Sequence, residues 1–258
     1  MIAIAPDWRP LTDELSRWSD AGLTLPIWWR DDDASRATPE LARLSALSRR
    51  VGLPVHLAVV PARAQADLAG IDDNLIPLIH GWAHLNHAPE SARKAEFGAH
   101  RPLAAMLTDC RAGLDRLRDL FGARLCPVFV PPWNRIAPDL IARLPGLGFT
   151  ALSTFTPRDR AFAAPGLARI NTHLDPVDWR GTRGLADPAL LIARITAQLA
   201  DRRAGIADNA EPYGLLTHHL IHDDAIWGFT GDLLGRLSDG PTTIWRADRP
   251  LEPKGTTT

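Results

Sequence analysis

The chain has 258 residues, 45% of them hydrophobic, and a formal net charge of −1. A chain of this length buries a large core unaided, so we expect one domain over residues 1–258, with a disordered tail over about 250–258. The balanced charge gives no reason to expect nucleic acid as a partner, and no apolar run approaches the roughly 20 residues that span a bilayer.

Strand-like and helix-like segments alternate along the chain. Helices are predicted over residues 11–19, 38–52, 103–121, 137–144, 188–203 and 231–237. Strands are predicted over residues 25–30, 54–60, 75–80, 126–130, 149–152, 168–173, 213–217 and 242–245. Strands separated by helices indicate an α/β fold with a parallel sheet, and a distorted (β/α) barrel is the natural closure at this length.

The cysteines and the first residues bear on location. Cys110 and Cys126 are too few for a disulfide framework, and their spacing does not suggest a metal site. The start of the chain lacks a basic region followed by an apolar stretch, so no signal peptide is expected. Two ordinary thiols are typical of a reducing compartment, and we expect a cytoplasmic protein.

Four polar clusters follow strand-like runs. They cover residues 31–33, 80–84, 131–134 and 218–222. Strand C-termini in a parallel sheet or barrel share one face of the molecule, where binding and catalytic sites are built. Clusters far apart in the sequence are therefore expected to converge.

The first two clusters have the composition of a metal site. His80 and His84 are four residues apart, so two imidazoles on one helical turn can bind one cation. The adjacent carboxylates of residues 31–33 repel one another, and a cation nearby relieves that repulsion. One carboxylate would bind the cation and a neighbour would act as a base. An Asp and two His form a set of three ligands that leaves open positions for water and a substrate carbonyl.

The last cluster supplies protonatable groups. Residues 215–224 include His218, His219 and His222, and an imidazole titrates near neutral pH. One of the three could protonate a leaving group, and the sequence does not select among them. His173 is a further candidate for the site.

The order of the motifs resembles that of the polysaccharide deacetylases, the NodB-like carbohydrate esterases. That family has an Asp-Asp pair, an H-x-x-x-H pair, an Arg-Pro-Pro-aromatic-Gly segment, an Asp-Trp segment and a Leu-x-His segment. The chain offers, in the same order, Asp32-Asp33, His80/His84, Pro131-Pro132-Trp133-Asn134, Asp178-Trp179 and Leu216-Thr217-His218. Each motif is weak alone, and five in the same order over residues 25–222 are strong together.

The resemblance implies a role for each matching residue. Asp32 would be the general base and His218 the general acid. Asp33, His80 and His84 would hold one divalent metal ion. The residues that would contact the substrate are Pro132, Trp133, Asn134, Asp178 and Trp179; the Trp133 backbone would face the acetate oxygen, and Trp179 would line the pocket wall.

The resemblance also implies a fold and a reaction. The fold would be a distorted barrel of about seven parallel strands, and the metal would be zinc, with cobalt, nickel or manganese as alternatives. The enzyme would remove an N-acetyl group from an acetylated amino sugar or saccharide, releasing acetate. The partner is therefore a small-molecule or saccharide substrate, and a sugar made in the cytoplasm fits the expected location.

The chain departs from the family pattern at two places. The first motif reads Arg30-Asp-Asp-Asp-Ala34, so Asp31-Asp32 is an alternative register to Asp32-Asp33. Val130 stands where the family has the arginine that pairs with the base, and Arg30 or Arg135 is the candidate substitute.

Two other functions share the pattern. One is a metal-dependent hydrolase of another amide, such as an N-formyl group, since the carbonyl chemistry is the same and only the pocket differs. The other is a non-catalytic sugar-binding protein on the same fold. The missing arginine favours the second, and the complete set of ionisable residues disfavours it.

Overall fold

The computed structural model describes residues 5–249. The α-helices are α1 (Arg9–Asp20), α2 (Pro39–Val51), α3 (Leu103–Phe121), α4 (Pro138–Ile141), α5 (Leu144–Leu147), α6 (Pro188–Arg203) and α7 (Asp224–Ser238). The strands are β1 (Leu25–Ala34), β2 (Val55–Val59), β3 (Leu75–His80), β4 (Val128–Val130), β5 (Ala151–Leu152), β6 (Phe162–Ala164), β7 (Leu167–Arg169), β8 (Tyr213–Thr217) and β9 (Thr242–Ile244). Short 3₁₀ turns include η4 (Pro132–Asn134) and η5 (His219–Ile221).

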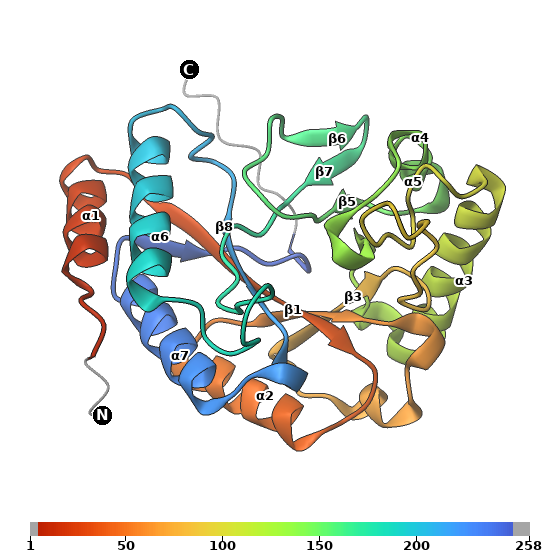
Figure 1. The fold of residues 1–258 in the computed structure, drawn as a ribbon, viewed down its shortest axis with the longest axis horizontal. Coiled ribbons are helices and arrows are strands. Elements are labelled where there is room, and N and C mark those ends of the chain that lie inside the picture. Colours follow the sequence, from red (N-terminus) through yellow and green to blue (C-terminus); the bar gives the residue numbers. More distant parts are fainter. Residues whose placement is uncertain (1–4, 250–258) are drawn as a thin grey trace.

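The strands form one curved, open sheet. Their order is β6-β7-β5-β4-β3-β2-β1-β8, and β9 also pairs with β1. Every pairing is parallel except that of β6 with β7, which form a small hairpin at one edge (Figure 1). The predicted α/β fold, a distorted barrel with a mostly parallel sheet, is confirmed. Within residues 5–249 the sheet has nine strands rather than about seven, because β6 and β9 add to it.

The helices cover the outer face of the sheet. Helix α1 packs beside α6, and α2 beside α7, while α3 to α5 lie at the other end (Figure 1). Helix α2 has the predicted ends: the Thr38 hydroxyl accepts a hydrogen bond from the Leu41 N–H, and Gly52 closes the helix at φ 69°. Helix α7 begins earlier than predicted because the Asp223 carboxylate caps it by accepting from the Ile226 N–H.

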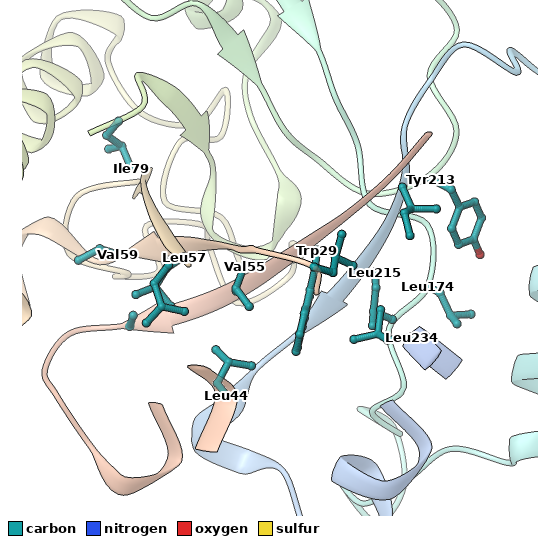
Figure 2. Close-up of a cluster of buried hydrophobic side chains, with 14 of the residues drawn as sticks. Trp29, Leu44, Val55, Leu57, Val59, Ile79, Leu174, Tyr213, Leu215 and Leu234 are labelled. Carbon is teal, nitrogen blue, oxygen red and sulfur yellow. The ribbon is translucent and has the colours of Figure 1, made fainter. Parts of the chain in front are cut away.

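Alternation along β1 decides what reaches the barrel interior. Trp29 belongs to the large core between sheet and helices, with side chains of β2, β8 and α2 (Figure 2). Trp28 belongs to a separate, smaller cluster with Val128 and Val130 on the inner face. Successive strand residues point to opposite faces, so Asp31 follows Trp29 outward and Asp32 follows Trp28 inward.

Two further expectations concern the rest of the chain. Cys110 and Cys126 are both buried, free thiols. None of the helices within residues 5–249 is long and apolar enough to cross a bilayer. The expected disordered tail over about 250–258 lies outside the described residues.

Candidate active site

Asp33, His80 and His84 come together at the C-terminal ends of β1 and β3. The Asp33 Oδ1 lies 3.2 Å from the His80 Nε2 and 3.3 Å from the His84 Nε2. The three potential ligand atoms lie within 4.8 Å of one another. Burial opposes ionisation of Asp33, but the hydrogen bond and charge of His80 outweigh it and hold the pKa of Asp33 below its usual range.

The donor chemistry of this triad fits a divalent cation. The His80 Nδ1 lies 3.0 Å from the Val130 carbonyl, to which it donates, so the Nε2 lone pair is left for a cation held between it and Asp33. Burial lowers the pKa of His80, but the charges of Asp32 and Asp33 outweigh burial, and the pKa is raised. The two carboxylates therefore favour a positive charge at this point. Two imidazole nitrogens and a carboxylate oxygen are the ligand types that zinc and similar metals take.

Asp32 lies beside the triad and is paired with Arg30. The Arg30 Nη2 donates to the Asp32 Oδ2 at 2.9 Å, and the Arg30 Nε lies 2.9 Å from the Oδ1. Both side chains are buried. Arg30 therefore holds both carboxylate oxygens, and Asp32 lines the pocket beside the triad, where a base would lie.

Arg30 is itself fixed by neutral partners. Its Nη1 donates to the Ser153 hydroxyl at 2.7 Å, and its Nη2 donates to the Asn134 side-chain oxygen at 2.8 Å. Arg135 instead donates to a backbone carbonyl, that of Lys94. Of the two candidates for the missing motif arginine, Arg30 is the one that reaches Asp32.

Asp31 does not reach the pocket. It is fully buried on the outer face of β1, where it accepts from the Thr217 hydroxyl at 2.6 Å and pairs with His219. Burial lowers the pKa of His219, but the charge of Asp31 more than offsets this, so the His219 pKa is raised. This ion pair joins β1 to the turn after β8 and leaves Asp32 as the carboxylate beside the triad.

Only one histidine of the last cluster lines the pocket. His218 does so, with its Nδ1 3.8 Å from the Asp175 Oδ2 and its ring edge-on to Trp179, 4.8 Å between centroids. His222 accepts a hydrogen bond from the His218 N–H, and burial lowers the pKa of His222 to about 4. His222 is therefore neutral at pH 7 and supports His218.

The pocket has the size of a ligand site and a strained lining. Its volume is about 570 Å³, within the range of small-molecule sites. Positive φ is uncommon outside glycine and is sustained only where the surroundings impose it. Six described non-glycine residues have positive φ, and five of these line the pocket: Asp33, His84, Trp133, Asn134 and Arg183.

Solved structures with a similar fold exist. A T48 deacetylase with substrate is 14% identical with a TM-score of 0.52, covering 89% of this chain and 92% of that one. A polysaccharide deacetylase structure from Mycobacterium smegmatis is 16% identical with a TM-score of 0.57, covering 77% and 70%. The peptidoglycan deacetylase PdaC from Bacillus subtilis, as the D285S mutant, is 14% identical with a TM-score of 0.52, covering 86% and 87%.

The fold is that of the polysaccharide deacetylases. At these identities the likeness establishes the fold alone. No family model matches the chain, and no curated protein matches it.

On this deacetylase fold, most residues selected from the sequence share one pocket. Its lining contains Asp32, Asp33, His80, His84, Trp133, Asn134, Trp179 and His218. Asp178 lies outside that lining, because its carboxylate accepts from the Gly181 and Thr182 N–H groups and shapes a turn. His173 is also elsewhere, buried against Glu211 and Arg202.

Asp175 was not among the residues selected for the site. It is partly buried in the pocket wall and accepts from the Trp179 indole N–H at 2.7 Å. Burial raises the pKa of Asp175 although the charge of His218 opposes the rise. Asp175 thus holds the Trp179 indole by a hydrogen bond and lies close to the His218 imidazole, whereas Asp178, predicted to contact the substrate, shapes a turn outside the lining.

Glu96 is the second residue that the sequence did not reveal. It is fully buried and accepts from three backbone N–H groups of the loop that carries His84. The donors are Trp82 (3.1 Å), Ala83 (2.8 Å) and Leu85 (3.4 Å). Satisfying these donors fixes the loop in the conformation that turns His84 toward Asp33.

Gly81 explains the place of Pro132. A Cβ on Gly81 would lie 2.4 Å from the Glu96 Oε2 and 2.5 Å from the Pro132 Cδ, and Gly81 also has φ 56°. Only glycine fits between these two neighbours. Pro132 is buried against this glycine.

Proposed function

We propose that the chain is a metal-dependent hydrolase that removes an N-acetyl group from an acetylated amino sugar or saccharide. The observation that carries the proposal is the meeting, in one pocket, of the Asp33–His80–His84 triad, the Arg30-paired Asp32, and His218. A triad alone would fit a structural metal. The Asp32 carboxylate and the His218 imidazole beside it would add the proton acceptor and donor that amide hydrolysis needs.

The triad would hold one divalent cation, and zinc is the metal we propose. When bound, it would polarise the acyl carbonyl and favour ionisation of a water molecule. Asp32 would take the proton from that water, while Arg30 keeps the carboxylate in place. His218 would give a proton to the departing amine, and Asp175 would orient its ring.

The tryptophans would bind the substrate. Trp179 is 44% exposed, and its indole N–H is anchored by Asp175, so its face can cover a sugar ring. The Trp133 backbone, held at φ 56°, would contact the acyl oxygen. The products would be acetate and a free amine. We retain a cytoplasmic location as part of this proposal.

The alternatives differ in substrate or in turnover. An N-formyl or other amide would use the same residues, so a series of N-acetyl and N-formyl sugars separates these hydrolases. The non-catalytic alternative drew support from Val130, and the Arg30–Asp32 pair removes that support.

Acetate release tests the proposed function. With zinc supplied, Asp32→Asn should lower turnover at least about 10³-fold and retain the metal, because the ligand set is untouched. Undiminished turnover in Asp32→Asn would show that another group is the base. If the metal-loaded wild type binds acetylated sugars but releases acetate from none of them, the sugar-binding alternative would be favoured.

A further inference from the structure

Three arginines surround the pocket that holds the triad. They are Arg135, Arg183 and Arg194. Arg183 belongs to the loop after Trp179, and Arg194 to helix α6, and both are exposed. Arg135 follows η4 and is partly buried. Segments from three regions of the chain therefore bring positive charge to one opening.

Each arginine is held by groups without charge. The Arg135 Nη1 donates to the Lys94 carbonyl at 2.6 Å. The Arg194 guanidinium lies 5.5 Å from the centre of the Phe155 ring, itself part of the lining. These contacts fix position without neutralising charge.

Arg183 is held through its backbone. Its N–H donates to the Asp178 carbonyl, and it has φ 62°, a conformation that side chains other than glycine adopt only under strain. The Asp178 carboxylate fixes the same turn by accepting from Gly181 and Thr182. A turn that imposes a strained conformation on a residue at the pocket mouth is a recognised sign of a functional position.

The carboxylates of the pocket do not neutralise these arginines. Within residues 5–249, none of the three arginines forms an ion pair. Asp32 is paired with Arg30, Asp33 faces the two histidines, and Asp175 accepts from Trp179.

Arg135 also has a like charge beside it. Burial and the charge of Arg93 lower the pKa of Arg135, so repulsion here is not relieved by an acid. The mouth therefore has an excess of positive charge that an anion would offset.

We propose that the substrate carries an anionic group, phosphoryl or carboxyl, which Arg183 and Arg194 bind while the acyl group faces the triad. Guanidinium groups bind both oxyanions through paired, charge-assisted hydrogen bonds. This inference rests on the proposed function, since it names the substrate class of the same pocket. A neutral acetylated sugar would leave the arginines without a partner.

The test compares anionic and neutral substrates in matched variants. The substrates are N-acetylglucosamine, its 1-phosphate, its 6-phosphate, and N-acetylmuramic acid, each assayed for acetate release and for binding by calorimetry. The proteins are the zinc-loaded wild type, Arg183→Gln, Arg194→Gln and the control Arg111→Gln, which removes one charge from the exposed side of α3 outside this pocket. The measured quantity is the ratio of kcat/KM, or of affinity, for an anionic over the neutral compound.

We expect this ratio to be about 10- to 100-fold in the wild type and in Arg111→Gln, because charge-assisted hydrogen bonds contribute that much. It should fall at least about tenfold in Arg183→Gln and in Arg194→Gln. Preference for the phosphates identifies a phosphoryl group, and preference for N-acetylmuramic acid a carboxyl group.

Two results would overturn parts of the account separately. Equal ratios near one in all four proteins, with acetate released, would refute the anionic substrate and leave the deacetylase proposal intact. If no compound releases acetate but binding is anion-selective and depends on Arg183 and Arg194, the proposed reaction would be refuted and the anion site supported.

Discussion

The buried pair between Arg30 and Asp32 gives the sharpest quantitative prediction. The two side chains are 0% and 4% exposed, and the Arg30 Nε lies 2.9 Å from the Asp32 Oδ1. Removing one partner of such a pair costs about 3–5 kcal/mol, because the other charge stays buried without compensation. We therefore expect Arg30→Met to lower the free energy of unfolding by about 3–5 kcal/mol in urea denaturation.

A double-mutant cycle isolates the pair from the other contacts of Arg30. Asp32→Asn removes the carboxylate charge with little change of shape. In the double variant Arg30→Met/Asp32→Asn both charges are gone, so neither is left buried without its partner. Its loss of stability should be smaller than the sum of the single losses by at least about 1–3 kcal/mol. Arg135→Met is the matched control and should lose only about 1 kcal/mol, since it donates to a carbonyl. Additive single losses, with coupling below about 0.5 kcal/mol, would refute the reasoning.

Three further predictions concern other residues. Glu96→Ala leaves the His84 loop without its acceptor, so zinc affinity in a chelator competition should weaken about 10- to 100-fold; unchanged affinity would exclude a positioning role. His218→Gln should lower kcat about 10²- to 10⁴-fold and His222→Gln less than about tenfold, and the reverse order would identify His222 as the acid. Burial lowers the pKa of His56 to about 4, so the free energy of unfolding should fall by up to about 3 kcal/mol as the pH drops from 6.5 to 4. Urea unfolding at pH 7 and at pH 4 measures this fall, and His56→Gln should show a fall that is smaller by that amount.

The sign of the pH effect follows from the hydrogen bonds of His56. Its Nδ1 donates to the Trp29 carbonyl, and its Nε2 accepts from the Ala247 N–H. Protonation of the Nε2 would remove that acceptor, so the folded state favours the neutral ring. The unfolded chain takes up the proton near pH 6.5, and acid therefore favours unfolding.

Much of the fold was predictable because its signals are local. Helices α3 and α6 begin and end where the periodicity, Gly122 and Pro188 indicate. Strand β7 overlaps the strand predicted over residues 168–173, whereas its hairpin partner β6 was not predicted. The start of α7 was missed because it depends on one capping aspartate, Asp223.

The sequence could not decide between Asp31 and Asp32 because both faces of β1 are buried. Trp28 and Trp29 are both apolar because β1 is covered on both faces, so no alternation marks the inner one. Once the structure shows which tryptophan faces inward, the period of two assigns Asp32 to the pocket. Arg30 lies two residues before Asp32 on that face, which is why it can take the place of the arginine missing at Val130.

Asp175 and Glu96 could not be selected from the sequence for a different reason. Asp175 meets His218 only through the pairing of the segment around Leu174 with β8. Glu96 lies in an irregular stretch and acts through its contacts with backbone N–H groups. Neither leaves a spacing or composition signal, because each role depends on a tertiary contact.

Metal analysis tests the central claim most directly. Wild type, Asp32→Asn and the double variant His80→Ala/His84→Ala would be purified without chelator, desalted and measured for bound metal. We predict about one equivalent of zinc or another divalent metal in the wild type and in Asp32→Asn, and a loss of that metal in the double variant. Absence of metal from all three proteins, even after addition of zinc, cobalt, nickel or manganese, would contradict the account.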